Sequence, residues 1–281
     1  MTPVKPPSVA SGRPRGRPKE ARFLKPVETP VNQSLEKALG LLKTLSDHDG
    51  LTLTELSEAT GLPPSTAHRL LGTLSVHELA IMDEASQKWS IGIESLRIGA
   101  AFQRRNSVIS AGRAAMTDLM EATGETVNLA ILDRFEVVFV SQVECHEPIR
   151  AFFAIGQRRA IHASGIGKAL LAHMPVDRLN GWLARAALPG FTPATITDAD
   201  ELRAELTVTK ARGWALDDEE ANPGMRCIAA PVYNVYGEAT AGISLSGPST
   251  RLTPQRLPEL GLKVRETADH ISRLTGGGLL A

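Results

Sequence analysis

The most constraining feature of the sequence is the segment 53–74, in which two short amphipathic stretches meet at a glycine. Thr52 and Glu55 have the spacing of a capping box, in which the hydroxyl and the carboxylate each satisfy a free backbone N–H at the start of a helix. Gly61 supplies the left-handed backbone that a tight turn between helices requires. The pattern predicts two helices joined at Gly61, which is typical of a helix-turn-helix.

The second of these helices is predicted to have one apolar and one polar face. It should begin at Pro63 or Pro64, because a first-turn proline lacks only an N–H that would have no partner there. The core-facing stripe recurs at helical spacing and consists of Ala67, Leu70, Leu71 and Leu74. The outward face carries small or hydrogen-bonding groups that can reach phosphates and base edges in a major groove. From this face we predict four DNA contacts, by Ser65, Thr66, His68 and Arg69.

The flanking sequence predicts the remainder of a winged helix. Upstream lies a further helical stripe that would complete a three-helix core, formed by Leu35, Ala38, Leu39, Leu42 and Leu45. Downstream, the apolar runs 81–82 and 89–91 enclose polar residues, as two strands and their turn would. We predict a phosphate contact at Lys88 in this wing, for which the alternative is an ordinary solvated lysine.

A second feature that favours DNA lies near the N-terminus, where residues 11–19 read SGRPRGRPK and are similar to an AT-hook. An Arg-Gly-Arg strand has no side chain at its centre, so its backbone can lie deep in the narrow minor groove of A·T-rich DNA beside Arg15 and Arg17. The alternative is a disordered, solubilising tail. Charge favours DNA, because residues 1–30 carry seven Lys or Arg and two Asp or Glu, whereas residues 31–100 carry five and nine.

Length and composition predict a soluble protein of two domains, because 281 residues with 42% hydrophobic content can bury a sizeable core. No apolar run approaches the length of a bilayer, so we predict no membrane partner and a cytoplasmic, nucleoid-associated location. The two cysteines, Cys145 and Cys227, predict reduced thiols rather than a disulfide framework. A formal net charge of zero argues against a non-specific DNA coat.

After the wing, the sequence predicts a linker helix and then an α+β domain. Strands are predicted at 126–132, 136–143, 151–155, 215–218, 226–233 and 239–246, and helices at 108–122, 165–173, 176–187, 199–212 and 254–274. Strands clustered around separate helices suggest a sheet of mixed or antiparallel strands. The predicted domains are a basic arm at 1–30, a winged helix-turn-helix at 31–92, the linker helix at 93–110, a second domain at 111–276 and a tail at 277–281.

One segment of the second domain has the composition of an anion-binding site. Residues 161–172 read IHASGIGKALLA, so small residues lead directly into a helix. Unpaired N–H groups at Gly165, Ile166 and Gly167 can point at an anion, with the positive end of the helix dipole behind them. A carboxylate would suit this site. Ser164 is better explained as the cap of the helix than as a ligand contact.

Four ordered motifs together resemble the IclR family of bacterial transcription regulators. They are the helix-turn-helix, HASGIGKALLA at 162–172, WALDDEEANPGMRC at 214–227 and IAAPVYNVYGEATAGISLSGPSTR at 228–251. The resemblance covers residues 34–274. It implies a winged helix-turn-helix, a linker helix and a GAF-like mixed α/β effector domain, in a homodimer or a dimer of dimers. Such a dimer would bind double-stranded DNA at a pseudo-palindromic operator, with an A·T-rich flank for the arm. No cofactor and no metal is predicted.

The resemblance also implies an effector pocket, which falls on Gly165, Ile166, Asp217, Cys227, Ser244 and Ser246. Backbone donors would hold a carboxylate, and the serine hydroxyls would hold the remaining oxygens. An ionised Asp217 would repel an anion, so it must accept from the hydroxyl of a hydrated aldehyde, orient a donor or be protonated. Within the family the motifs are most similar to the acetate-operon branch, which implies an effector of the glyoxylate or pyruvate type.

The sequence departs from its relatives in two places. A flexible apolar wall is expected where the chain has Pro148, Ala151, Phe152 and Phe153. A change in the volume of this wall would change which ligand fits. His77 and Glu78 stand where the wing is more usually entered through a glycine, which would alter the orientation of the wing.

Two other functions stay open from the sequence. Cys227, His162 and Asp217 would be the nucleophile, base and orienter of a cysteine-dependent hydrolase, although nothing in their spacing holds them together. A ligand-independent architectural DNA-binding protein is the other alternative, and the large second domain argues against it. A zinc site formed by Cys145, His146, His162 and Cys227 would lack the usual close ligand pairs. We predict a sequence-specific, non-enzymatic regulator that responds to a small carboxylate, with the direction of regulation open.

Overall fold

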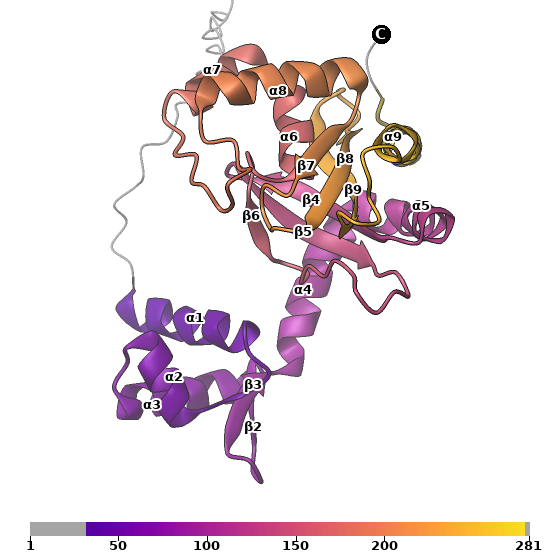
Figure 1. Cartoon of the computed structure of the whole chain (residues 1–281). Coiled ribbons are helices and arrows are strands. Elements are labelled where there is room, and N and C mark those ends of the chain that lie inside the picture. The colour runs from indigo at the N-terminus through magenta and orange to yellow at the C-terminus, as the bar shows by residue number, and fades with distance from the viewer. Residues whose placement is uncertain (1–31, 279–281) are drawn as a thin grey trace, which may run out of the picture. The chain divides into compact units, whose positions relative to one another are not determined.

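The computed structural model describes residues 32–278, which form two compact units divided in the chain between Ser95 and Leu96 (Figure 1). The predicted basic arm, with Arg15 and Arg17, lies outside the described residues, so its role stays a prediction. No helix within 32–278 combines the length and the apolar character needed to cross a bilayer.

The first unit is a winged helix. Its elements are α1 (Gln33–Ser46), β1 (Leu51–Thr52), α2 (Leu53–Thr60), α3 (Pro64–Val76), β2 (Ala80–Asp83) and β3 (Lys88–Ile91), with the strands in the order β1-β3-β2. The predicted capping box is present, because the Thr52 hydroxyl accepts from the Glu55 N–H and the Glu55 carboxylate accepts from the Thr52 N–H. Gly61 ends α2 in the left-handed conformation, with φ 67°. The helix-turn-helix predicted from these residues is confirmed.

The core of the first unit differs from the predicted stripe at α1. Leu35 and Leu39 are 58% and 46% exposed, whereas Leu41 is fully buried and was not predicted. Leucines occur on more than one side of α1, so helical periodicity alone could not choose the inward face. The buried core consists of Leu41, Leu45, Leu56, Ala67, Leu71, Leu74, Ala80 and Trp89.

The wing is the antiparallel hairpin of β2 and β3, with Met82 opposite Trp89. Glu78 precedes it with φ 55°, so the left-handed conformation that glycine adopts most easily is held here by a glutamate. Gly92 follows β3 and donates its N–H to the Leu79 carbonyl. A Cβ on Gly92 would lie 2.1 Å from the Glu78 oxygen, so the chain leaves the wing through a point where only glycine fits.

Two helices follow the wing, corresponding to the linker helix predicted at 93–110 and the helix predicted at 108–122. These are α4 (Ile93–Arg105) and α5 (Ser107–Thr123), and they are divided at Asn106. The rest of the second unit comprises β4 (Thr126–Asp133), β5 (Glu136–Val143), β6 (Arg158–Ala160), α6 (Gly165–Ala172), α7 (Val176–Leu183), α8 (Ala199–Arg212), β7 (Ala215–Asp218), β8 (Met225–Tyr233), β9 (Ala239–Pro248) and α9 (Leu257–Leu274).

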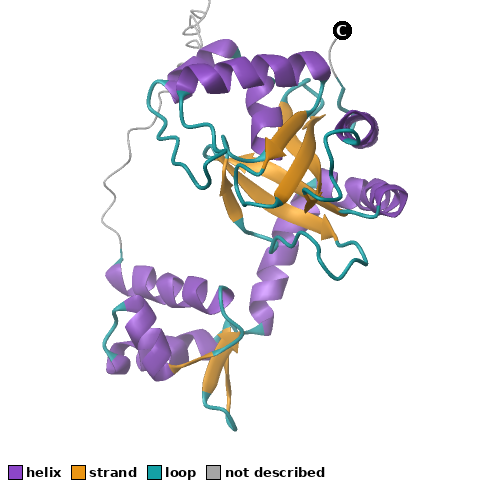
Figure 2. Ribbon diagram, viewed as in Figure 1, coloured by secondary structure: helices purple, strands orange, loops and turns teal. Residues whose placement is uncertain are grey.

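The strands of the second unit form one antiparallel sheet in the order β6-β5-β4-β9-β8-β7, with helices on both faces (Figure 2). The predicted strand at 151–155 is wrong, because residues 151–154 have no regular structure and β6 lies later in the chain. Ala151 and Phe153 are nevertheless buried. Their apolar side chains produce a strand-like sequence without strand pairing.

The two faces of the sheet belong to separate cores. Helices α5 and α9 cover one face, and the side chains of Ile243 and Leu245 of β9 are buried there. Helix α6 covers the other face, where a Cβ on Gly242 would lie 2.8 Å from the Ile166 side chain. Because side chains alternate along a strand, Ser244 and Ser246 share the face of Gly242. The alternation thus turns the polar side of β9 toward the start of α6.

Candidate functional site

The start of α6 is built by glycines and one serine. The Ser164 hydroxyl accepts from the Gly167 N–H at 3.0 Å, so Ser164 caps the helix and Gly167 is not the free donor that was predicted. The N–H groups of Gly165 and Ile166 have no acceptor among residues 32–278. A Cβ on Gly167 would lie 1.9 Å from the Ile161 carbonyl oxygen, and one on Gly165 would lie 3.1 Å from that of Cys227. Close backbone packing therefore fixes the direction of the two free amides.

One cavity brings together all six residues predicted for the effector pocket. Its lining consists of Gly165, Ile166, Asp217, Cys227, Ser244 and Ser246, together with Phe139, Phe153, Arg159, Ser164, Ala221 and Asn222. The cavity encloses about 340 Å³ of empty space including its mouth, but a water-sized molecule can move freely in only about 20 Å³ of it. That room is close to what one water molecule needs. The enclosed part of the cavity is therefore very small.

Asp217 forms the acidic side of the cavity and is 4% exposed. Its Oδ1 accepts from the backbone N–H of Glu220 at 2.8 Å and of Ala221 at 3.4 Å. Burial raises the pKa of Asp217 to about 7, against the opposing effect of the Glu220 N–H. This carboxyl is therefore partly protonated near neutral pH, and the protonated form does not repel an anion.

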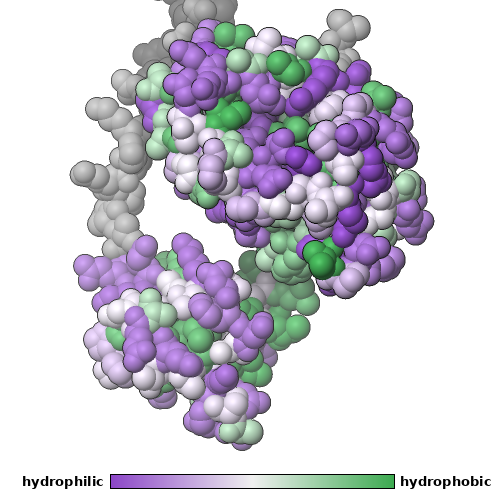
Figure 3. Space-filling view, in the orientation of Figure 1, coloured by the Kyte–Doolittle hydropathy of each residue, from purple (hydrophilic) through white to green (hydrophobic). Residues whose placement is uncertain are grey.

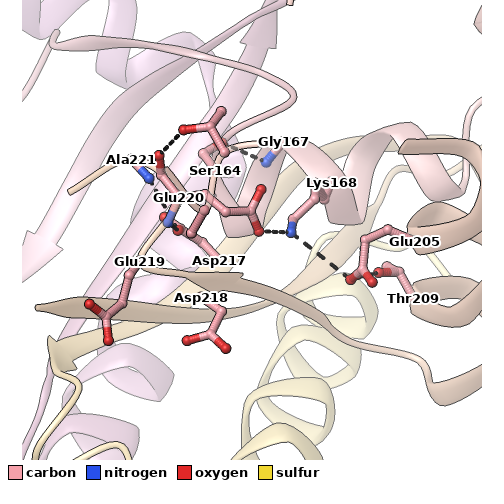
Figure 4. Close-up of polar contacts among 12 residues, drawn as sticks. Ser164, Gly167, Lys168, Glu205, Thr209, Asp217, Asp218, Glu219, Glu220 and Ala221 are labelled. Atoms are coloured by element: carbon pink, nitrogen blue, oxygen red, sulfur yellow. Dashed lines mark hydrogen bonds and ion pairs between the residues drawn. The ribbon is translucent and has the colours of Figure 1, made fainter. Parts of the chain in front are cut away.

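A buried ion pair holds the loop that follows Asp217. Lys168 of α6 is 1% exposed, and its Nζ donates to Glu220 Oε1, with Glu205 Oε1 of α8 at 4.0 Å (Figure 4). Thr195 donates its hydroxyl to the Glu220 carbonyl at 2.6 Å. The loop that carries Ala221 into the cavity is therefore fastened from two sides. Sequence reasoning missed this role of Lys168, although a lysine in a helix of otherwise apolar or small residues was an available signal.

A row of buried polar side chains supports the serine side of the cavity. Asn128 of β4 donates to the Ser246 hydroxyl at 3.2 Å, and Gln142 of β5 donates to the Asn128 carbonyl at 2.8 Å. Ser246 thus accepts from Asn128, and its hydroxyl also makes a hydrogen bond with the Cys227 thiol. Ser244 lies opposite Asn128 in the β4–β9 ladder and is 2% exposed. Ser244 and Ser246 both line the cavity.

The apolar wall and a cation complete the lining, and sequence reasoning missed two of these three residues. Phe139 of β5 stacks on Phe153 with ring centroids 4.5 Å apart. Arg159 of β6 lies over the Phe153 ring, with Cζ 5.7 Å from its centroid. Phe139 could not be distinguished from an ordinary core residue in its strand. Arg159 follows another arginine in a segment where no strand was predicted, so the pair had the pattern of a solvated surface.

The geometry opposes the predicted alternative of a cysteine nucleophile. Burial raises the pKa of the Cys227 thiol well above its usual range, and the charge of Asp217 adds to the rise. A thiolate at Cys227 is therefore rare at neutral pH. His162 Nε2 lies 3.1 Å from the Pro189 carbonyl oxygen, and His162 is not among the residues that line the cavity. Cys145 is buried in the core on the opposite face of the sheet from Cys227, so the two thiols do not share a metal site.

The residues predicted to contact DNA lie on the outer side of α3 and on the wing. Ser65, His68 and Arg69 are exposed, while Thr66 is half-buried. Lys88 begins β3 and is exposed. The helix thus presents its predicted polar face, with its buried residues on the other side.

Comparisons with known proteins cover both units. Residues 34–80 match the IclR helix-turn-helix domain, and residues 100–273 match the family described as "Bacterial transcriptional regulator IclR C-terminal". The chain is 47% identical to the HTH-type transcriptional regulator BhcR of Paracoccus denitrificans over 93% of this chain and 92% of that protein. It is 36% identical to the acetate operon repressor of Salmonella typhimurium, over 94% and 96%. The crystal structure of the Thermotoga maritima IclR superposes with a TM-score of 0.76 at 28% identity, over 87% and 99%.

Proposed function

This chain belongs to the IclR family of transcriptional regulators, and from that premise we propose that a small carboxylate of the 2-oxo acid type, such as glyoxylate or pyruvate, controls its binding to DNA. The family membership makes the chain a DNA-binding regulator with a ligand-binding C-terminal domain, and not an enzyme. The identity of the ligand, the residues that bind it and the form of the DNA site are the proposed part.

The observation that carries the proposal is the pair of free amides at Gly165 and Ile166, which open into a cavity with very little room. Two backbone donors at a helix N-terminus are suited to a carboxylate. The hydroxyls of Ser244 and Ser246 supply donors for a neighbouring carbonyl or hydrate oxygen. A protonated Asp217 can donate a hydrogen bond instead of repelling the ligand.

For the DNA-binding end, we propose that α3 enters a major groove with Ser65, Thr66, His68 and Arg69 toward the bases. Lys88 would contact a phosphate. We further propose that the arm lays Arg15 and Arg17 along an A·T-rich minor groove beside the site. The protein would then act in the cytoplasm, on the nucleoid.

A homodimer, or a dimer of dimers, is the form in which we propose that the protein binds DNA. Helix α4 supports this proposal, because none of its residues is buried among residues 32–278. Apolar, green atoms are exposed at its position in Figure 3. Its large exposed apolar side chains are Ile93, Leu96, Ile98 and Phe102. Ile93 and Leu96 lie on one side of the helix and Ile98 and Phe102 on another, and exposed apolar side chains in this number mark an interaction surface. Two copies would read a pseudo-palindrome with half-sites one helical turn or a multiple of it apart.

The test combines calorimetry with DNA footprinting on the full-length protein. We expect heat of binding with at least one member of a panel of two- to four-carbon acids that includes glyoxylate and pyruvate. The same acid should change the footprint on a genomic fragment selected by the protein. Absence of heat with every acid would refute the proposed effector class. Equal binding to selected and random duplex would refute sequence-specific DNA binding.

A further inference from the structure

The two neighbouring arginines of β6 have opposite environments. Arg158 points outward and pairs with Asp133 at 2.5 Å and with Glu136 at 2.8 Å. Arg159 lines the cavity and is half-buried. No carboxylate lies within ion-pair distance of Arg159 in residues 32–278. Because the residues are adjacent on one strand, alternation alone sends one guanidinium to solvent and the other into the cavity.

The Arg159 guanidinium has an unsatisfied hydrogen-bond donor. Its Nε is fully buried and has no hydrogen-bond partner among the described residues. A buried donor without a partner destabilises the folded protein, and a charged one does so more strongly. Phe153 contacts the face of the guanidinium, which leaves its edge, with the N–H donors, directed elsewhere.

The charges around the cavity favour an anion. Lys168 is neutralised by Glu220, and Asp217 has a pKa of about 7 because of its burial. Arg159 is therefore the lining cation whose charge is not matched by a neighbouring acid. A guanidinium can hold a carboxylate through two parallel N–H···O bonds, which a point charge cannot do.

We propose that Arg159 binds the carboxylate of the effector directly and makes the cavity select anions over uncharged molecules of the same shape. The inference rests on the function proposed above. It adds to that function the group that selects the charge of the ligand. The backbone amides at the start of α6 then donate either to the same carboxylate or to the neighbouring carbonyl or hydrate oxygen.

The experiment compares Arg159→Met with Arg158→Met, the same substitution on the adjacent residue. Glyoxylate and pyruvate are titrated into the full-length proteins, each beside its primary amide as the uncharged isostere. A charge-assisted hydrogen bond contributes about 1.5–3 kcal/mol, so we expect Arg159→Met to weaken acid binding about 10- to 150-fold. Amide binding should hardly change. Arg158→Met should keep the wild-type preference for acid over amide, and Arg159→Lys should recover part of it.

Thermal unfolding separates this role from a structural one. Arg159→Met removes no hydrogen bond or ion pair within residues 32–278, and the methionine can still pack on Phe153. The ligand-free variant should therefore melt at or above the wild-type temperature while losing the rise in melting temperature that the acid causes. A lower melting temperature with an unchanged acid-to-amide preference would overturn the inference. If the wild type binds none of these acids, the proposed function falls together with it, whereas equal binding by wild type and Arg159→Met overturns the role of Arg159 alone.

Discussion

Asp217 and Cys227 lie opposite each other in the ladder between β7 and β8, and they are 4% and 7% exposed. Burial and the nearby carboxylate raise the pKa of the thiol, so the native protein should react slowly with a disulfide reagent at pH 8. Cys145 is also buried. We expect both thiols to react rapidly only in denaturant. Fast labelling of native wild type that Cys227→Ser abolishes would contradict this and reopen the hydrolase alternative.

The raised pKa of Asp217 predicts how stability depends on pH. The folded protein keeps a proton up to about pH 7, whereas the unfolded chain loses it near the ordinary value of 3.8. The contribution of Asp217 to the free energy of unfolding is therefore largest below about pH 4, and it falls as the pH rises toward 7. Asp217→Asn should lack this decline. The difference in free energy of unfolding between the variant and the wild type should therefore grow by at most about 1.4 kcal/mol per pH unit.

Urea unfolding of wild type and Asp217→Asn between pH 4 and 8 measures the effect. The asparagine Oδ1 can still accept from the Glu220 and Ala221 amides, so the variant should fold. Parallel pH profiles would show that Asp217 is ionised throughout. The wild type and Asp217→Asn should also differ in how their affinity for an anion depends on pH. The wild-type affinity should fall above pH 7, and that of Asp217→Asn should not.

The buried Lys168–Glu220 pair predicts a strong asymmetry between single and double substitutions. Lys168→Met leaves the Glu220 carboxylate buried without a cation, which costs about 3–5 kcal/mol of stability. The Lys168→Met/Glu220→Gln double variant should cost less than Lys168→Met alone. Lys263→Met is the control, because Lys263 pairs with Glu259 on the exposed side of α9 and such pairs contribute about 0.2–0.5 kcal/mol. Equal losses in the control and in Lys168→Met would be the contrary result.

Two substitutions separate base reading from phosphate contact in the first unit. Arg69→Ala should reduce binding to the selected site by about 1–3 kcal/mol and leave ligand binding intact. Lys88→Ala should weaken binding to selected and random DNA alike, and should lower the salt slope by about one. Gel shifts at several salt concentrations, with calorimetry as the folding control, measure both. A loss of ligand binding in Arg69→Ala would indicate misfolding instead.

Removal of residues 1–25 tests the basic arm. The arm is basic while residues 31–100 carry a net negative charge, so the deletion should weaken DNA binding and flatten its dependence on salt. The matched control replaces only Arg15 and Arg17 with alanine and should show a smaller loss in the same direction. An unchanged affinity and an unchanged slope would assign the arm no role in binding.

Sequence patterns located secondary-structure elements accurately where strong local features marked the ends of these elements. Helix α8 was predicted to the residue, because Asp198 caps its first turn and Gly213 ends it in the left-handed conformation. The hairpin of β4 and β5 was also found, although its turn contains Arg134 and Phe135 with positive φ in place of glycine. The start of α9 was predicted three residues early, since Pro254 precedes the helix rather than opening it.

The site was only half predictable for a physical reason. The motif residues of α6, β7, β8 and β9 converge because α6 packs on these neighbouring strands, and their pattern is visible in the chain. Arg159 and Phe139 reach the same cavity from β6 and β5 through strand pairing between distant segments. Nothing local distinguishes the half-buried Arg159 from the solvated Arg158, because only the pairing register decides which one turns inward.

The close packing at Gly165 and Gly167 has a consequence for how such a receptor can diverge. One end of its recognition surface is made of peptide groups, which no point mutation can exchange for another chemistry. The apolar side chains of the lining, Phe139 and Phe153, offer bulk that a point mutation can change. On the proposed function, related sensors would then keep a ligand with an acidic head and differ in the part of the ligand that lies behind it.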